Sequence, residues 1–393
     1  MTGTTVGALG SPHQVHVDAR GRVAPHDHDW SLDWWVGADD HWHIPAREPT
    51  VRQSLVDAAP VTRTALRVPH GDAVQHVYGV GGPGDPVVIE VTNESPAPFV
   101  LALVISGAHR VEVDGTTVAV DGHPTLWLTR PPSRWAASTD NTTQAQVRAG
   151  DARGGPFVPQ RDRHGRLEVA LLHPVAHRTR LRSALRLDGD PPPDLERLPD
   201  PDAAARGWQA QLTRGLQVDV PDDRLADALR RARAEALLAG VRRPVDPLVV
   251  AALEDWGFDG EARAAWSRLS WKARRVAASR AATPPSWAEL TAATQHGGAP
   301  LLLATRALLA HETDAATITL LAELPPHWTG HGIEVHDAPT RHGPLSYAVR
   351  WHGARPALLW EAPPGVRLRA PGLDPTWSSE TTRGDALLAA AVA

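Results

Sequence analysis

A glutamate beside a tryptophan at a predicted helix start is the first feature of this chain that could do chemistry. The run Ser286-Trp287-Ala288-Glu289 opens a helix expected near residues 287–294. A carboxylate placed there could act as a general base, and an adjacent tryptophan ring could stack on the apolar face of a sugar. Ser-x-x-Glu also fits a capping box, in which Glu289 serves only its own helix. Both interpretations stay open at this point.

Two further carboxylates stand at the end of another expected helix. Glu254 and Asp255 directly precede Trp256 and Gly257. Negative charge at a helix C-terminus opposes the macrodipole, which makes these residues candidates for a functional role as the acid partner. An exposed helix end would tolerate them without any such role. Trp256 is a second candidate platform for a sugar.

Two histidine-rich loops have the composition of metal sites. One is His26-Asp27-His28-Asp29 and the other is Asp39-Asp40-His41-Trp42-His43. Imidazole and carboxylate groups together bind divalent ions. Neighbours on one loop seldom supply all the ligands, and His-rich loops are commonly just solvated. We therefore predict no metal ligands and leave metal binding by these loops open.

The composition excludes several classes of function. The chain has 393 residues, a net charge of −5 and no basic stripe, so nucleic acid is not an expected partner. No apolar run is long enough for a membrane helix, and the N-terminus has no secretory pattern. The absence of cysteine favours a cytoplasmic protein. No phosphate-binding loop, dinucleotide fingerprint or nucleophile elbow is found, so no cofactor is predicted. The oligomeric state stays open.

The order of the expected elements predicts an α+β chain. Short alternating segments with turn signals indicate an antiparallel β-sandwich over residues 1–187, including a hairpin at 111–120. A Pro- and Asp-rich linker is expected at 188–221 and an array of short helical hairpins at 222–316. A β segment with a hairpin at 345–361 closes the chain at 317–393. The helices are expected at 224–239, 248–255, 260–269 (with a continuation to 279), 287–294 and 301–311.

The tail of the chain resembles the closing β segment of actinobacterial glucoamylase-like glycoside hydrolases. The residues that carry this resemblance are Pro-Pro-His-Trp-Thr-Gly-His-Gly-Ile-Glu-Val at 325–335 and the run at 338–353. The block from Trp30 to Tyr78 is similar to the N-terminal β-sandwich of those enzymes, and the run at 250–258 is similar to one helix and turn of their (α/α)6 toroid. The resemblance implies carbohydrate as the partner.

The resemblance also implies roles for single residues. Glu289 would be the base that hydrolyses a glucosidic bond, Glu254 or Asp255 the acid, and Trp287 and Trp256 the platforms. His296 matches part of a Gly-His-His-Gly-Trp-like segment, and Trp42 lies on a loop of the kind that the sandwich lends to the cleft. These two are predicted to contact substrate.

The chain departs from the family in its helical part. A toroid needs twelve helices, and about five fit into residues 222–316. We therefore expect a truncated α/α toroid. A catalytically inactive carbohydrate-binding or scaffold protein, derived from such an enzyme, is the alternative function.

Overall fold

The protein is mostly β and divides into two compact units. The computed structural model describes residues 3–187, 194–277 and 286–389, and the side chains of residues 275–277 and 295–296 lie outside this description. The units comprise residues 1–207 and 208–393. The boundary between them falls within a helix, Pro201–Leu212, of the predicted linker. Four sheets of nine, nine, five and four strands are formed by the described residues.

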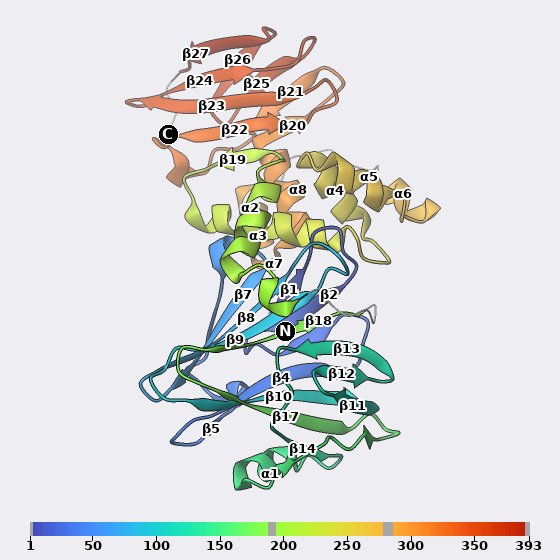
Figure 1. The fold of residues 1–393 in the computed structure, drawn as a ribbon. Coiled ribbons are helices and arrows are strands. Elements are labelled where there is room, and N and C mark those ends of the chain that lie inside the picture. The colour runs from blue at the N-terminus through green and yellow to red at the C-terminus, as the bar shows by residue number, and fades with distance from the viewer. Residues whose placement is uncertain (1–2, 188–193, 278–285, 390–393) are drawn as a thin grey trace. The chain divides into compact units, whose positions relative to one another are not determined.

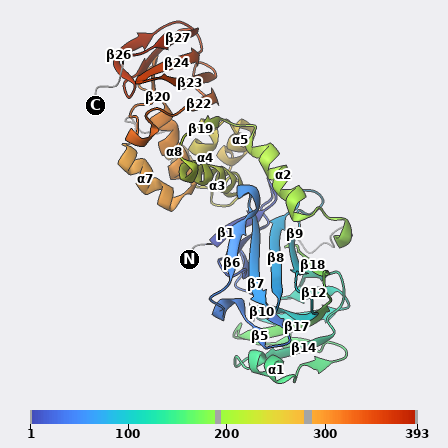
Figure 2. The same ribbon diagram turned by 90° about the vertical axis from the view of Figure 1, so that its left-hand side faces the viewer.

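The first unit contains two nine-stranded antiparallel sheets (Figure 1). The first sheet has the order β1 (Gly3–Gly7), β2 (Gln14–Asp18), β3 (Val23–Pro25), β4 (Ser31–Gly37), β10 (Phe99–Ala108), β17 (Leu167–Val175), β14 (Arg134–Ser138), β15 (Arg153–Gly154), with β5 (Trp42–His43) paired to β4. The second has the order β16 (Gln160–Arg161), β11 (Arg110–Asp114), β12 (Thr117–Val120), β13 (His123–Leu128), β18 (Arg180–Leu185), β9 (Val87–Asn93), β8 (Gly71–Gly79), β7 (Val61–Val68), β6 (Arg52–Leu55). Figure 2 shows β6 to β9 side by side.

One hydrophobic core joins the two sheets, as in a β-sandwich. Leu103 of β10 and Leu171 of β17 come from the first sheet, and Val77 of β8 and Ile89 of β9 come from the second. Alternation of side chains along each strand sends every second residue into this core. The coarse prediction of sandwich-like sheets is therefore confirmed.

The first sheet is apolar on its outer face as well. Ala102 and Val104 of β10 point away from the main core and pack with Trp35 and Ile44 in a second cluster. Helix α1 (Thr143–Ala149) contributes Val147 to the same cluster. The segment after β5 contributes Ile44 and continues into a short 3-10 helix, η1 (Pro45–Arg47).

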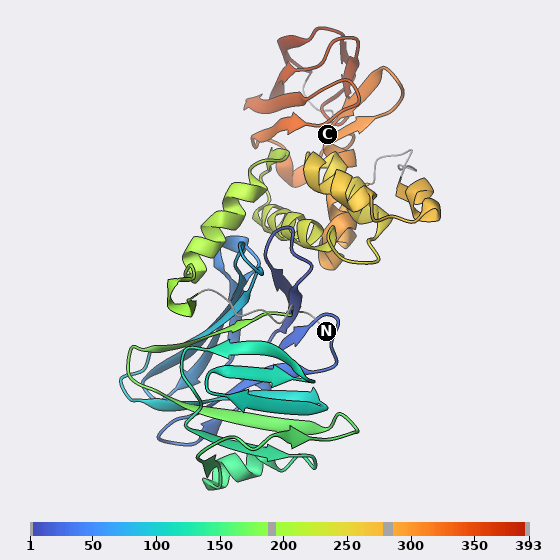
Figure 3. The same cartoon turned by 45° about the vertical axis from the view of Figure 1, so that its right-hand side comes forward.

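The second unit combines a cluster of helices with two small sheets (Figure 3). The helices are α2 (Pro201–Leu212), which begins in the first unit, α3 (Asp223–Ala239), α4 (Pro247–Asp255), α5 (Asp259–Trp266), α6 (Trp271–Ala277), α7 (Trp287–His296) and α8 (Gly298–Leu309). The five-stranded sheet has the order β19 (Gln217–Asp219), β22 (Ile333–Ala338), β23 (Leu345–His352), β24 (Arg355–Glu361), β27 (Arg383–Leu387). The four-stranded sheet has the order β20 (Ala310–Glu312), β21 (Thr317–Leu320), β25 (Arg367–Ala370), β26 (Asp374–Ser379). The remaining 3-10 helices of the chain are η2 (Val56–Ala58), η3 (Leu195–Arg197) and η4 (Pro326–Trp328).

The predicted α+β class with a truncated α/α toroid is wrong. Helices α3, α4 and α7 all pack on α8, so the cluster has a helix at its centre rather than a ring of hairpins around an axis. Strands account for more of the described chain than helices do. No α/α toroid is formed by the described residues.

Several local predictions are confirmed. The hairpin at 111–120 is formed by β11 and β12, with Val111 opposite Val120. The hairpin at 345–361 is formed by β23 and β24, with His352 opposite Arg355. Among the described residues, no helix is both long and apolar enough to cross a membrane.

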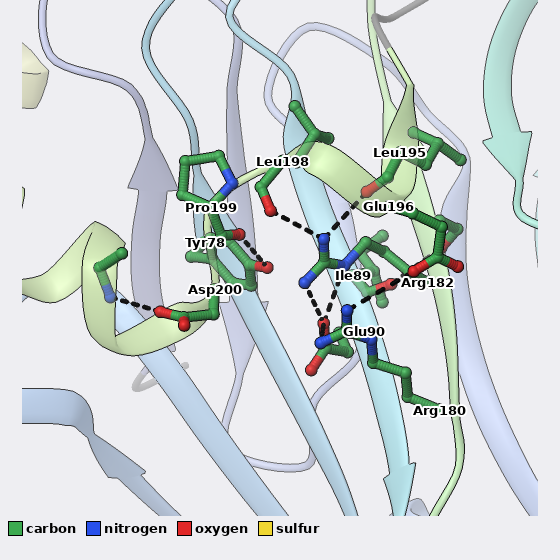
Figure 4. A network of polar contacts seen from close by, with 12 residues as sticks. Tyr78, Ile89, Glu90, Arg180, Arg182, Leu195, Glu196, Leu198, Pro199 and Asp200 are labelled. Atoms are coloured by element: carbon green, nitrogen blue, oxygen red, sulfur yellow. Dashed lines mark hydrogen bonds and ion pairs between the residues drawn. The ribbon is translucent and has the colours of Figure 1, made fainter.

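A buried ion pair anchors the segment that leaves the sandwich (Figure 4). Arg182 of β18 is almost fully buried, and its Nε and Nη2 lie 2.8 and 2.7 Å from Oε2 of Glu90 on the neighbouring strand β9. Nη1 of Arg182 donates to the carbonyls of Leu195 and Leu198, each at 2.9 Å. The hydroxyl of Tyr78 donates to the carbonyl of Pro199 at 2.9 Å. Side chains of the second sheet thus satisfy the backbone of residues 195–199.

Removal of one partner of this ion pair should destabilise the first unit strongly. Arg182→Met leaves the buried Glu90 with only its longer contact to the partly exposed Arg180, and it leaves two carbonyls without their donor, so we expect a loss of about 3–5 kcal/mol in the free energy of unfolding. Urea denaturation measures it. Arg180→Met is the matched control, because Arg180 also contacts Glu90, at 3.4 Å, but is partly exposed. Its expected cost is below about 1 kcal/mol, and equal costs for the two variants would contradict the analysis.

His173 of β17 should make the first unit sensitive to acid. Its ring is fully buried and neither nitrogen has a hydrogen-bond partner among the described residues. Burial, and next the charge of Arg130, lowers the pKa of His173 to about 4. Between pH values of about 4 and about 6.5, His173 is protonated in the unfolded chain but not in the folded chain. The free energy of unfolding therefore falls by about 3 kcal/mol as the pH drops from about 6.5 to about 4.

Denaturation at several pH values between about 7 and about 4 tests this dependence. His173→Leu should flatten the fall in unfolding free energy over this range. His123→Leu, which changes an exposed histidine of β13, should leave it as in the wild type. A fall that His173→Leu does not reduce would rule out His173 as its source.

Candidate functional site

Helix α7 begins with a capping box that uses the carboxylate of Glu289. Oγ of Ser286 accepts from the amide of Glu289 at 3.3 Å. Oε2 of Glu289 accepts in return from the amide and the hydroxyl of Ser286, at 2.7 and 3.0 Å. These hydrogen bonds hold the pKa of Glu289 below its usual range, because they favour the ionised form. The capping-box interpretation is confirmed.

A second carboxylate, which sequence reasoning missed, lies at the same helix start. Oε2 of Glu323 accepts from the amide of Trp287 at 2.8 Å, across 36 positions of sequence. Because the amides of residues 286 and 287 are neighbours, the carboxylates of Glu289 and Glu323 lie less than about 10 Å apart. Glu323 belongs to the loop after β21, so no sequence pattern near α7 predicts its contact with the amide of Trp287.

Aromatic rings stand beside these carboxylates. The half-buried ring of Trp287 lies 5.2 Å from the ring of His327 and 5.4 Å from that of Trp328, between centroids. Trp328 is fully buried, whereas half of the His327 side chain is exposed. We call Trp287, Glu289, Glu323 and His327 the Trp287 group. It combines a half-buried aromatic ring with two exposed carboxylates that accept from the amides of residues 286 and 287.

The predicted acids lie elsewhere in the second unit. Glu254 and Asp255 are half-buried in the last turn of α4. Glu289 is in the first turn of α7. The structure thus places the predicted base at the N-terminus of one helix and the predicted acids at the C-terminus of another.

Trp256 is a core residue rather than a platform. Its ring is fully buried, and its indole N–H donates to the carbonyl of Leu302 in α8 at 2.9 Å. The guanidinium of Arg233 lies 5.6 Å from the ring centre. A ring enclosed in this way has no face for a sugar, so the prediction of Trp256 as a substrate contact is corrected on physical grounds.

Glu235 is the carboxyl group of the helical cluster that is best suited to hold a proton. Burial of its carboxyl end raises the pKa of Glu235, although the residue as a whole is exposed, and the amide of Gly298 opposes the shift. Its carboxylate lies close to Gly297 and Gly298, just beyond the C-terminal end of α7. With a rise of 1.5 Å per residue, this end is about 12 Å along the axis from Glu289.

The remaining predicted contacts are separate from this group. His296 is the last residue of α7, and its side chain lies outside the described part of the chain. Trp42 belongs to the first unit, where its half-buried ring covers Gly37 and packs against the outer cluster of the first sheet. This contact with the outer cluster accounts for its partial burial.

One of the two histidine-rich loops brings its ligand atoms together. The nearest ligand atoms of Asp40, His41 and His43 all lie within 4.8 Å of one another. In the residues that the structure describes, the loop at 26–29 forms no such group.

An open hollow of about 490 Å³ lies in the first unit between Arg20, Pro49 and Gln53. Its lining contains no carboxylate and none of the predicted site residues. It therefore has no groups for acid–base hydrolysis.

Comparison with known proteins finds no matching protein family and no matching curated protein. The glucoamylase-like resemblance accordingly stays a prediction.

Loss of the N-cap should loosen α7. Ser286→Ala removes the acceptor for the Glu289 amide, and we expect a cost of about 1 kcal/mol in urea denaturation of the second unit. The stabilisation that Glu289 supplies is present at neutral pH and is lost as the pH falls through its lowered pKa. Ser378→Ala, at an exposed position of β26, is the control and should cost little. If both variants unfold alike, the cap contributes nothing measurable.

Proposed function

We propose that the protein binds carbohydrate through the Trp287 group and does not hydrolyse the glycosidic bond. The observation that carries this proposal is the pair of carboxylates at the start of α7. Glu289 and Glu323 each use Oε2 to accept from a backbone amide beside the ring of Trp287. They are oriented before any ligand arrives, so little conformational entropy remains to be lost on binding.

The chemistry of the Trp287 group suits a polyhydroxylated ligand. Oε1 of Glu289 and of Glu323 has no hydrogen-bond partner among the residues that the structure describes, and both side chains are exposed. Such oxygens accept hydrogen bonds from hydroxyl groups. The ring of Trp287 has an apolar face and a polar edge. A sugar has hydroxyl groups around its rim, which can donate to the carboxylate oxygens, and C–H groups on its face, which can stack on the indole ring.

One block that carries the family resemblance contributes to this group. His327 and Trp328, whose rings contact that of Trp287, come from the Pro-Pro-His-Trp run of the tail. This contact supports a glucan as the ligand class.

Hydrolysis is less well supported than binding. A general acid needs a raised pKa and a position about 5–10 Å from its partner carboxylate. The pKa of Glu289 is lowered, and Glu235, whose pKa is raised, lies about 12 Å away along α7. With Trp256 buried, the arrangement that the resemblance implies for catalysis is incomplete.

Calorimetric titration with α- and β-linked gluco-oligosaccharides tests binding. We expect saturable binding to the wild type and an affinity loss of about tenfold or more in Trp287→Ala, equivalent to about 1.4 kcal/mol. Trp377→Ala is the matched control, because Trp377 is another half-buried tryptophan of the second unit, paired with Trp360 at 5.2 Å. Glu323→Gln should also weaken binding, by removing the charge on one acceptor.

Product release from the same oligosaccharides tests the second half of the proposal. We expect no sugar release by the wild type. Release that disappears in Glu289→Gln would establish a hydrolase instead. Absence of binding to every oligosaccharide, or equal losses in Trp287→Ala and Trp377→Ala, would reject the Trp287 group as a carbohydrate site.

A further inference from the structure

Two histidines of the first unit are held between two carboxylates. Nδ1 of His41 and Nε2 of His43 lie 3.1 and 3.0 Å from the oxygens of Asp40. Nε2 of His41 and Nδ1 of His43 lie 3.5 and 3.4 Å from Oε1 of Glu48. The two rings face each other with centroids 3.9 Å apart. Each ring therefore has one nitrogen near Asp40 and the other near Glu48.

Neutral imidazoles cannot satisfy this arrangement. A neutral ring carries one N–H and one lone pair, and an ionised carboxylate only accepts. Two neutral histidines can thus donate in only two of the four contacts, and two lone pairs are left against negative charge. Two protonated rings would donate in all four contacts but would place like charges 3.9 Å apart. A cation bound by Asp40 and by the nitrogen of each ring that lies near Asp40 removes both conflicts, because the other nitrogen of each ring then carries the proton and donates to Glu48.

Burial adds an independent observation. The His43 side chain is only 7 % exposed, and its Nδ1 makes no hydrogen bond within the described part of the chain. A buried polar atom without a partner destabilises the fold unless a bound group gives it a partner. Nδ1 faces Glu48, so the unsatisfied atom is aimed into the cluster.

We propose that Asp40, His41 and His43 bind one divalent transition-metal ion, Zn²⁺ or an ion of similar preference, while Glu48 accepts from the second nitrogen of each ring. A set of two imidazoles and a carboxylate favours such ions over Mg²⁺ and Ca²⁺, which take oxygen ligands. The nearest ligand atoms of Asp40, His41 and His43 lie within 4.8 Å of one another. Ligands at about 2.0–2.2 Å from a common ion are at most about 4.4 Å apart, so small side-chain rotations suffice.

The backbone brings the three ligands and Glu48 together from separate turns. Asp40 and His41 lie on the loop between β4 and β5, closed by a hydrogen bond from the amide of Ala38 to the carbonyl of His41 at 3.1 Å. Glu48 follows η1, and the guanidinium of Arg20 donates to its carbonyl. A bound ion would therefore join the β4–β5 loop to the end of η1 and fasten residues 38–48, which help to cover the outer face of the first sheet.

Metal-free protein, prepared by dialysis against a chelator, is titrated with Zn²⁺ in a calorimeter and with Co²⁺ in a spectrophotometer. We expect one ion per chain, visible Co²⁺ bands typical of nitrogen ligation, and a higher melting temperature of the first unit with Zn²⁺. His41→Ala should weaken Zn²⁺ binding tenfold or more and abolish the Co²⁺ bands. His43→Ala should do the same if it folds. His41 is 53 % exposed, so His41→Ala tests the site even where the buried His43 is needed for folding.

His28→Ala is the matched control, because it removes an exposed histidine from the other histidine-rich loop of the same unit. It should bind both ions like the wild type. Failure of the wild type to take up one equivalent of either ion would overturn the proposal. Binding that His41→Ala leaves unchanged, or that His28→Ala weakens equally, would overturn it as well.

Discussion

The first unit depends on a sheet that is apolar on both of its faces. Leu101, Leu103 and Ile105 of β10 fill the core between the sheets, while Ala102 and Val104 of the same strand face outward. An outer face of this kind must be kept from water, at about 25 cal/mol for each Å² that is buried. Helix α1 and the segment that contains Ile44 cover it. His43 is paired with Val36 of β4, whose side chain lies in the core between the sheets, so His43 lies on the opposite face of β5 from Trp42. The position of the histidine–carboxylate cluster thus follows from the pairing of β5 with β4.

In the second unit, the corresponding constraint is the start of a helix. The first amides of α7 have no partner within the helix and must find acceptors. Ser286 and Glu289 satisfy two of them, and Glu323 satisfies the amide of Trp287. This demand fixes two carboxylates beside an aromatic ring and also commits one oxygen of each to the backbone. The lowered pKa of Glu289 makes its carboxylate a good acceptor for a ligand and a poor proton donor for a leaving group.

The parts that could be predicted from the sequence are those that neighbouring residues decide. The capping box at Ser286 and the hairpin that pairs Val111 with Val120 depend on residues within a few positions of each other. Contacts between distant residues could not be predicted. Glu323 reaches α7 across 36 positions, and Glu48 meets the two histidines only because η1 turns the chain back. The toroid was predicted from the resemblance alone. Three helices instead pack on α8, because helices associate through their apolar faces.

The two groups contain the same acidic residue types but are suited to different ligands, and the difference lies in what each carboxylate already faces. Glu289 and Glu323 face backbone amides, which donate, so their charge is partly compensated and their outer oxygens are left for neutral hydroxyl donors. Asp40 and Glu48 face imidazole nitrogens, of which only two can donate while both rings are neutral, so a positive charge is still required among them. We propose on this ground that the first arrangement selects a neutral ligand with many hydroxyl groups and that the second selects a cation. The immediate hydrogen-bond partners of each acidic residue therefore decide what the site can bind.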